Sequence, residues 1–280
     1  MIAPADYQML ARLLRQHSGL ALSEGKEYLV ESRLTPLAAA HGLPNLAALL
    51  ARLRTQPDAA LLRQVSEAMA THESLFFRDG TPFQLLRDEV LPALLKARRA
   101  QRRLRLWSAG TSTGQEAYSL AMTVAESWPL LSGWQVEILA TDYSEAAIAR
   151  ARRGVYNHFE VQRGLSLQHR AQYFTPADGA WRVRDELRAM IDFRTGNLLE
   201  PFGALGSFDV VFCRNVLIYF DVATKADVLD RLSRVLAPDG FLFLGSTETC
   251  TGICPRLLRA GTGTAPMYRP LASAADRLAG

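Results

Sequence analysis

The chain contains little cysteine and no long apolar segment. Its 280 residues include only Cys213, Cys250 and Cys254. This odd and sparse set argues against a disulfide framework and is typical of a reducing compartment. No apolar run approaches the roughly 18 residues that a membrane span needs, and the N-terminus lacks the basic and apolar regions of a signal peptide. We therefore expect a cytoplasmic protein without direct membrane insertion.

A strong net charge is also absent, but the basic residues are unevenly distributed. The formal net charge is +4, and residues 76–105 alone contain eight Lys and Arg against three Asp and Glu. Such a local excess of basic residues is typical of a surface that binds an acidic partner, or of a solvated helix end where cations are favourable. Nucleic acid is not expected as a partner, because nucleic-acid-binding domains are usually more basic and expose aromatic side chains.

Residues 1–70 contain no strand pattern and predict a small domain of four amphipathic helices. Asn45 and Asp58 each follow a proline and are expected to cap a helix. The apolar stripe of the second helix is expected to consist of Tyr28, Leu29, Ser32 and Leu37. Residues 71–90 would form a linker and the start of a connecting helix, with Thr81 as its N-cap.

From Leu104 onward, predicted strands alternate with predicted helices. Strands are expected at Leu104–Ser108, Val136–Thr141, Ile191–Arg194, Phe208–Cys213, Phe241–Gly245 and Met267–Arg269. The alternation predicts an α/β domain over 91–280, with a mainly parallel sheet covered by helices on both faces. Residues 155–192 interrupt this rhythm, and polar–apolar alternation around Asp178-Gly179 predicts a hairpin there. We expect a small antiparallel β-subdomain inserted at this place.

The segment Leu104–Met122 combines a strand, a turn of small residues and a helix, an arrangement that presents backbone N–H groups to a ligand. Its turn lacks the Lys-Ser/Thr ending of a P-loop and the three spaced glycines of a dinucleotide site. Asp142 ends the second strand, where a carboxylate can accept both hydroxyls of a ribose or cap the next helix. A ribose site without a pyrophosphate site favours S-adenosylmethionine as the ligand.

Five motifs, in order after the helical region, resemble those of the chemotaxis-receptor methyltransferases, the CheR family. They are THESLFFRD (71–79), WSAGTSTGQEAYSLAM (107–122), LATD (139–142), FRTGNLLE (193–200) and VFCRNVLIYFD (211–221). The resemblance implies a Rossmann-like class I S-adenosylmethionine-dependent methyltransferase domain with an N-terminal all-helical domain. It also implies methyl transfer to glutamate side chains on a chemoreceptor's cytoplasmic helical bundle, which yields methyl esters and S-adenosylhomocysteine for adaptation in chemotaxis.

The resemblance also implies which residues bind the cofactor. The complete set is His72, Ser74, Arg78, Glu116, Asp142, Asn197, Leu198, Arg214 and Asn215. Arg78 would pair with the cofactor's carboxylate and Glu116 with its ammonium, while Asp142 would accept the ribose hydroxyls. Asn197 and Leu198 would line the adenine. His72 and Ser74 stand where the family usually has Asn and Thr, which puts the role of His72 in question.

The implied reaction needs little chemistry from the protein. A glutamate with a pKa near 4.3 is already ionised at neutral pH, and the sulfonium is an activated leaving group, so alignment and water exclusion remain. We therefore expect no metal and no acid–base pair, and a monomer is the default state. Tyr219 is expected at the point of methyl transfer, and Arg98 or Arg99 is expected to face the substrate.

Some members of the family use the inserted subdomain to grip a pentapeptide at the receptor's C-terminus, and in those the hairpin turn is longer. Only Thr175–Trp181 separates Phe174 from Arg182 in this chain, so we expect a pentapeptide-independent enzyme. Two alternatives stay open. The chain could be a receptor- or regulator-binding module without turnover, or a nucleic-acid methyltransferase, which the Cys213–Val216 sequence disfavours.

Overall fold

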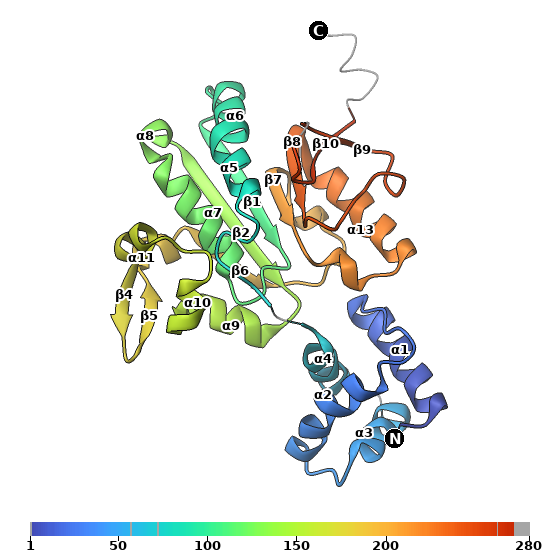
Figure 1. Ribbon diagram of the computed structural model, residues 1–280. Coiled ribbons are helices and arrows are strands. Elements are labelled where there is room, and N and C mark those ends of the chain that lie inside the picture. The colour runs from blue at the N-terminus through green and yellow to red at the C-terminus, as the bar shows by residue number, and fades with distance from the viewer. Residues whose placement is uncertain (1, 57, 72, 262, 272–280) are drawn as a thin grey trace. The chain divides into compact units, whose positions relative to one another are not determined.

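The computed structural model describes residues 2–56, 58–71, 73–261 and 263–271, and the chain divides into two compact units. The helical unit consists of Met1–Thr71 and Ile218–Lys225, and the sheet unit consists of His72–Leu217 and Ala226–Gly280 (Figure 1). The sequence did not predict that Ile218–Lys225 groups with the helical unit.

The described residues before position 71 form four helices, as predicted. These are α1 (Pro4–Ser18), α2 (Glu27–Ala40), α3 (Leu46–Thr55) and α4 (Ala59–Met69). Both predicted caps are present, because the side chains of Asn45 and Asp58 accept hydrogen bonds from backbone N–H groups two or three residues ahead. The stripe predicted for α2 is wrong, since Val30, Leu34 and Ala38 are buried while Tyr28 is 64% exposed. Helix α2 is apolar on several sides, so only its neighbours select the buried face.

Two polar contacts attach Ile218–Lys225 to the N-terminal helices. The backbone N–H of Ala21 donates to the carbonyl oxygen of Tyr219 at 2.8 Å. The Nε of Arg15 lies 2.5 Å from Oδ2 of Asp221. Tyr219 is therefore part of the helical unit, although it follows a strand of the sheet unit in the chain.

The sheet unit contains the predicted, mainly parallel sheet. The described strands are β1 (Arg103–Ala109), β2 (Gln135–Asp142), β6 (Ile191–Thr195), β7 (Phe208–Cys213), β8 (Leu236–Leu244), β9 (Leu257–Arg259) and β10 (Met267–Pro270). Their order is β6-β2-β1-β7-β8-β10-β9, and β10 runs antiparallel to both of its neighbours. Two details differ from the prediction. Strand β9 was not expected, and β8 begins at Leu236, ahead of the expected strand Phe241–Gly245 and beside a register shift.

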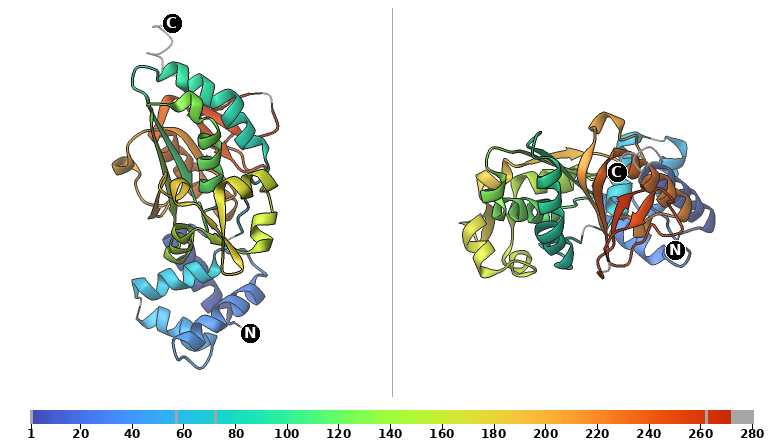
Figure 2. Two further views of the ribbon diagram at one scale, coloured as in Figure 1. Left: turned by 90° about the vertical axis from the view of Figure 1, so that its left-hand side faces the viewer. Right: turned by 90° about the horizontal axis from the view of Figure 1, so that it is seen from above.

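Successive side chains along the strands point to opposite faces of the sheet. Leu104, Leu106 and Ile138 share one core with the helices α5 (Thr81–Leu85), α6 (Leu91–Ala97) and α7 (Gln115–Glu126). Helix α13 (Val222–Val235), beyond Lys225, covers the opposite face (Figures 1 and 2). Helices on both faces bury the sheet, as a parallel sheet requires.

The connecting helix that was predicted to start at Thr81 is continuous but irregular, and it extends to Ala97. It begins with Gly80 as its N-cap rather than Thr81, and a π-helical turn at Leu86–Val90 separates α5 from α6. Pro92, in the first turn of α6, explains the irregularity. Proline has no N–H to donate and its ring clashes with the carbonyl four residues earlier, so the helix widens before it.

The predicted β-subdomain is present as a three-stranded antiparallel sheet in the described residues. Its strands are β3 (Val155–Tyr156), β4 (Phe174–Ala177) and β5 (Ala180–Val183), in the order β3-β5-β4 (yellow in Figure 2). The turn residues Asp178 and Gly179 have φ values of 42° and 74°. Two consecutive positive φ angles are typical of a two-residue hairpin turn, so the hairpin prediction is confirmed.

Candidate functional site

The turn between β1 and α7 approaches its neighbours so closely that side chains would not fit. A Cβ on Gly110, which has a φ of 80°, would lie 2.4 Å from Cγ2 of Val216. A Cβ on Gly114, with a φ of 96°, would lie 2.8 Å from Cβ of Ala151. Glycine is required at both positions because it alone combines a positive φ with this contact. The small residues thus set the turn tightly against the end of β7 and against α9 (Glu145–Arg153).

Asp142 fixes the same turn from the end of β2. Its carboxylate accepts hydrogen bonds from the backbone N–H groups of Ser112 at 2.7 Å and Ser144 at 2.9 Å. The backbone N–H groups of Gly110 and Thr111 both donate to the carbonyl oxygen of Thr141. Asp142 therefore lies at the carboxyl edge of the parallel strands, where ligands of open α/β sheets bind.

The segment after β6 reaches this edge as well. Thr195 pairs with Asp142 in the sheet, and the N–H of Gly196 donates to the Asp142 carbonyl oxygen at 2.9 Å. Asn197 then forms a turn in which its Oδ1 accepts from the N–H of Leu199, and Leu198 is only 8% exposed. The structure thus brings Asn197 and Leu198 to the same edge as Asp142.

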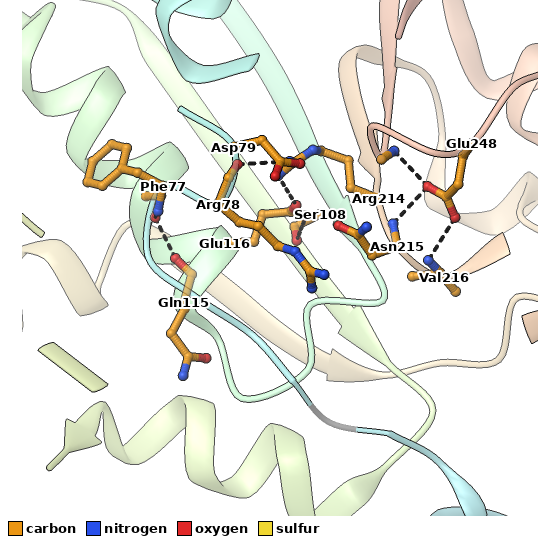
Figure 3. A network of polar contacts seen from close by, with 12 residues as sticks. Phe77, Arg78, Asp79, Ser108, Gln115, Glu116, Arg214, Asn215, Val216 and Glu248 are labelled. Carbon is orange, nitrogen blue, oxygen red and sulfur yellow. Dashed lines mark hydrogen bonds and ion pairs between the residues drawn. The ribbon is translucent and has the colours of Figure 1, made fainter. Parts of the chain in front are cut away.

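A buried ion-pair cluster lies at the other side of the turn (Figure 3). The side chain of Arg214 is 1% exposed, and its guanidinium lies 2.7 Å from Oδ2 of Asp79 and 3.1 Å from Oε2 of Glu116. It also donates to the carbonyl oxygen of Arg78 at 2.8 Å. Burial raises the pKa of Glu116, an effect opposed by Arg214 and by a hydrogen bond from Ser108.

The linker residues of this cluster are held in strained conformations by two different elements. Phe77 and Asp79 have φ values of 46° and 66°, which cost energy for residues other than glycine. The N–H of Phe77 donates to Oγ of Ser119 in α7. Phe76 is fully buried and packs edge-on against Tyr156 of the β-subdomain. The inserted subdomain and α7 together therefore determine the position of Asp79.

Glu248 completes the site and was missed in the sequence. Its carboxylate accepts from the backbone N–H groups of Gly245, Asn215 and Val216 at 2.6, 2.7 and 3.0 Å (Figure 3). It lies in the turn after β8, and nothing in its local sequence separates it from an ordinary surface glutamate. Only the pairing of β7 with β8 brings it to Asn215.

Several buried polar atoms around the turn have no hydrogen-bond partner within the described part of the chain. They include Oγ1 of Thr111, Oγ of Ser112, Nε of Arg214 and Oδ1 of Asn215. Buried polar atoms in native proteins are nearly always partnered. Their gathering beside Asp142 and Glu116 fits a polar ligand that supplies both donors and acceptors.

Comparison with known proteins identifies the family. The profile of the "CheR methyltransferase, all-alpha domain" matches residues 5–69, and that of the "CheR methyltransferase, SAM binding domain" matches residues 72–257. The chain belongs to the CheR methyltransferase family. Its sheet unit is accordingly a Rossmann-like class I methyltransferase domain that binds S-adenosylmethionine.

Curated relatives cover almost the same length as this CheR family member. "Chemotaxis protein methyltransferase 1" of Pseudomonas aeruginosa is 42% identical over 255 residues, which span 90% of this chain and 92% of the relative. "Chemotaxis protein methyltransferase Cher2" of Pseudomonas putida is 40% identical over 252 residues, 89% and 91% of the two chains. The Escherichia coli "Chemotaxis protein methyltransferase" is 35% identical over 253 residues, 88% and 85% of the two chains.

Arg98 is not brought to the site of this CheR methyltransferase. Its guanidinium lies 3.0 Å from Oδ1 of Asp209 and also pairs with Asp239, residues near the beginning of β7 and β8. These pairings place Arg98 at the edge of the sheet opposite Asp142, where a structural role explains it. They also account for part of the basic excess, since Arg103 and Arg105 pair with Glu137 in the same way.

Three further expected site residues are Tyr219, Ser74 and His72. Tyr219 belongs to the helical unit, so its role stays a prediction. Ser74 is half-buried in the linker, and His72 lies outside the described residues. Among the residues described, no group of three or more His, Cys, Asp or Glu could hold a metal ion. The helices of the described ranges include none that is long and apolar enough to cross a membrane.

Proposed function

We propose that this CheR family member transfers the methyl group of S-adenosylmethionine to glutamate side chains in the cytoplasmic region of a chemoreceptor. The observation that carries the proposal is the convergence of Asp142, Glu116, Arg214 and Asn215 at one edge of the sheet, beside buried polar atoms that have no hydrogen-bond partner among the described residues. The names of the curated relatives support a chemotaxis methyltransferase, and the glutamate acceptor is our inference from the family resemblance.

The residues divide between the two ends of the cofactor. In the proposal, Asp142 accepts the ribose hydroxyls, and Asn197 and Leu198 line the adenine. Glu116 accepts from the ammonium of the methionine part, and Arg78 pairs with its carboxylate through a guanidinium that suits bidentate binding. An ammonium beside Glu116 would favour its ionised form and so offset the burial that raises its pKa.

The methyl transfer itself requires orientation rather than proton transfer. The acceptor glutamate is ionised at neutral pH and attacks as a carboxylate. The enzyme must align this oxygen with the methyl carbon and the sulfur, and must exclude water. Tyr219 is proposed to contribute its hydroxyl at this point. Tyr219→Phe is then expected to lower the transfer rate while leaving the affinity for S-adenosylhomocysteine unchanged.

The test is methylation of receptor-containing membranes with S-adenosylmethionine labelled in the methyl group. Base treatment releases volatile methanol from a methyl ester, whereas a methylated amine or base keeps its label. Asp142→Ala is expected to abolish labelling. The matched control is Asp192→Ala, which removes an exposed carboxylate of β6 that pairs with Arg194 and is expected to retain activity. Label that resists base would refute the proposal.

The same assay separates the alternative of a binding module without turnover. In that case S-adenosylhomocysteine would bind to the sheet unit, as isothermal titration would report, but no receptor would be labelled. Failure of both measurements would argue against an intact cofactor site. Binding together with base-labile label is the outcome that we expect.

We further propose that the enzyme does not depend on a pentapeptide tether. Strands β4 and β5 are joined by the two-residue turn Asp178-Gly179, which is shorter than the turn expected in tether-dependent members. Methylation is therefore expected to be equally fast with receptors that carry or lack the C-terminal pentapeptide. Tight binding of the isolated pentapeptide in a titration would overturn this part of the proposal.

A further inference from the structure

Glu248 forms a bridge between the ends of two neighbouring strands. It is 6% exposed. One carboxylate oxygen, Oε2, accepts from the N–H groups of Gly245 and Asn215, and the other, Oε1, accepts from the N–H of Val216. Gly245 follows the end of β8, whereas Asn215 and Val216 follow β7. A single side chain therefore holds the turn after β7 against the end of β8.

The turn that Glu248 holds has a conformation that needs external support. Asn215 has a φ of 58°, a left-handed value that costs energy for a residue with a side chain, although asparagine adopts it more readily than most. It also lies so close to β8 that a Cβ on Gly245 would be 2.8 Å from both its backbone N and its Nδ2. Strained backbone persists where surrounding contacts over-determine it. Glu248 supplies those contacts through charge-assisted hydrogen bonds, which are stronger than neutral ones.

The residues at this turn carry unpartnered atoms. Nε of Arg214 and Oδ1 of Asn215 are buried without a hydrogen-bond partner among the described residues. Their direction is set by the backbone that Glu248 fixes, since Asn215 itself and Val216 donate to it. A relaxed turn would redirect the Asn215 amide and would loosen the backbone that carries Arg214.

We propose that Glu248 is a positioning residue, which preorganises Arg214 and Asn215 for the methionine end of S-adenosylmethionine without touching the cofactor. This inference rests on the proposed function, because that function assigns Glu116 to the methionine end, and Arg214, the chain neighbour of Asn215, pairs with Glu116. Glu248 is expected to raise the affinity for ligands that carry the amino-acid group. It is expected to affect little the affinity for the nucleoside part, which binds near Asp142.

The isosteric variant Glu248→Gln tests the proposal. Glutamine offers one acceptor oxygen and one NH₂ group, while both oxygens of Glu248 accept from N–H groups. At least one backbone N–H would therefore face a donor. Asp209→Asn is the matched control. Asp209 is also a buried carboxylate, accepts from the backbone N–H of Arg105 at 2.9 Å and pairs with Arg98, but at the opposite edge of the sheet.

The experiment measures two ligands by isothermal titration with the full chain. S-adenosylhomocysteine carries the amino-acid group, and 5′-methylthioadenosine lacks it. Glu248→Gln is expected to weaken the binding of S-adenosylhomocysteine by about tenfold, the loss of about one hydrogen bond between the ligand and a redirected Asn215 or Arg214. The affinity for 5′-methylthioadenosine is expected to stay within about twofold of wild type. Asp209→Asn is expected to change neither affinity, although it lowers the unfolding temperature.

The outcomes separate the possible failures. The positioning role would be overturned if Glu248→Gln lowered the affinities for both ligands equally, or lowered neither. A wild-type chain that binds neither ligand would overturn the proposed function instead. If Glu248→Gln does not fold, Glu248→Asp keeps the charge but shortens the side chain by one methylene, and the same selective loss is expected. Equal losses in that variant would also overturn the proposal.

Discussion

Gly164 is the position at which a single methyl group is expected to disturb the cofactor site from a distance. It lies in the inserted subdomain with a φ of 93°, and a Cβ there would be 1.8 Å from the carbonyl oxygen of Phe76. Phe76 is three residues from Asp79, which pairs with Arg214. Gly164→Ala must therefore displace the linker backbone, because the contacting atom is a carbonyl and not a flexible side chain.

The matched control for this substitution is Gly179→Ala in the same subdomain. Gly179 has a φ of 74°, but a Cβ there would meet nothing within 4 Å. It therefore measures the cost of the positive φ alone, about 1–2 kcal/mol. Gly164→Ala adds the overlap with Phe76, which we take as roughly 2–3 kcal/mol from the usual cost of overpacking.

Calorimetry of both variants checks these magnitudes. The relevant transition is the one that S-adenosylhomocysteine shifts upward, since a ligand stabilises the unit that binds it. With about 2–4 °C per kcal/mol for a domain of this size, Gly164→Ala is expected to unfold roughly 4–12 °C below Gly179→Ala. It is also expected to bind S-adenosylhomocysteine more weakly, whereas Gly179→Ala retains wild-type affinity. Equal unfolding temperatures in the two variants would refute the reasoning.

Two further substitutions test the ion pairs. Glu116→Gln is expected to weaken the binding of S-adenosylhomocysteine about tenfold and to lower the unfolding free energy by about 1–2 kcal/mol, because the buried Arg214 keeps Asp79 but loses one of its two carboxylate partners. Burial raises the pKa of Glu116, so wild-type affinity should fall as the pH is lowered toward that raised pKa, beginning above the ordinary range of a glutamate, while the affinity of Glu116→Gln stays level; parallel profiles would contradict this. Arg98→Ala leaves Asp209 buried without its partner and should cost roughly 2–3 kcal/mol of stability, with unchanged methyl transfer per folded molecule. A loss of transfer without a loss of stability would instead support Arg98 as a substrate-facing residue.

The linear sequence predicts most of the secondary structure because its signals are local. Helix caps at Asn45 and Asp58 and the Asp178-Gly179 hairpin are short-range patterns of backbone hydrogen bonding, and the structure contains each of them. The misplaced details have a common cause. The buried face of α2 and the early start of β8 depend on neighbours that are distant in the chain, and local periodicity contains no information about them.

In the candidate site, too, local sequence signals identify some residues, and only the fold identifies the partners of those residues. Strand-end residues such as Asp142 are recognisable because a turn of small residues and a following helix mark each end of a strand in the sequence. The partners of those residues are not recognisable, since Arg214 meets Glu116 and Asp79 across 98 and 135 residues. The family resemblance implied a substrate contact at Arg98 or Arg99, while the fold surrounds Arg98 with two aspartates.

The sequence by itself determined the alternating strands and helices, the glycine-bearing turn and the family, because each depends on residues within a few positions of one another. Only the tertiary structure decided that Glu248 holds the turn after β7, that Gly164 presses against the linker and that Ile218–Lys225 groups with the N-terminal helices. The physical reason is that buried backbone groups need partners, and the sheet, not the chain order, brings those partners together.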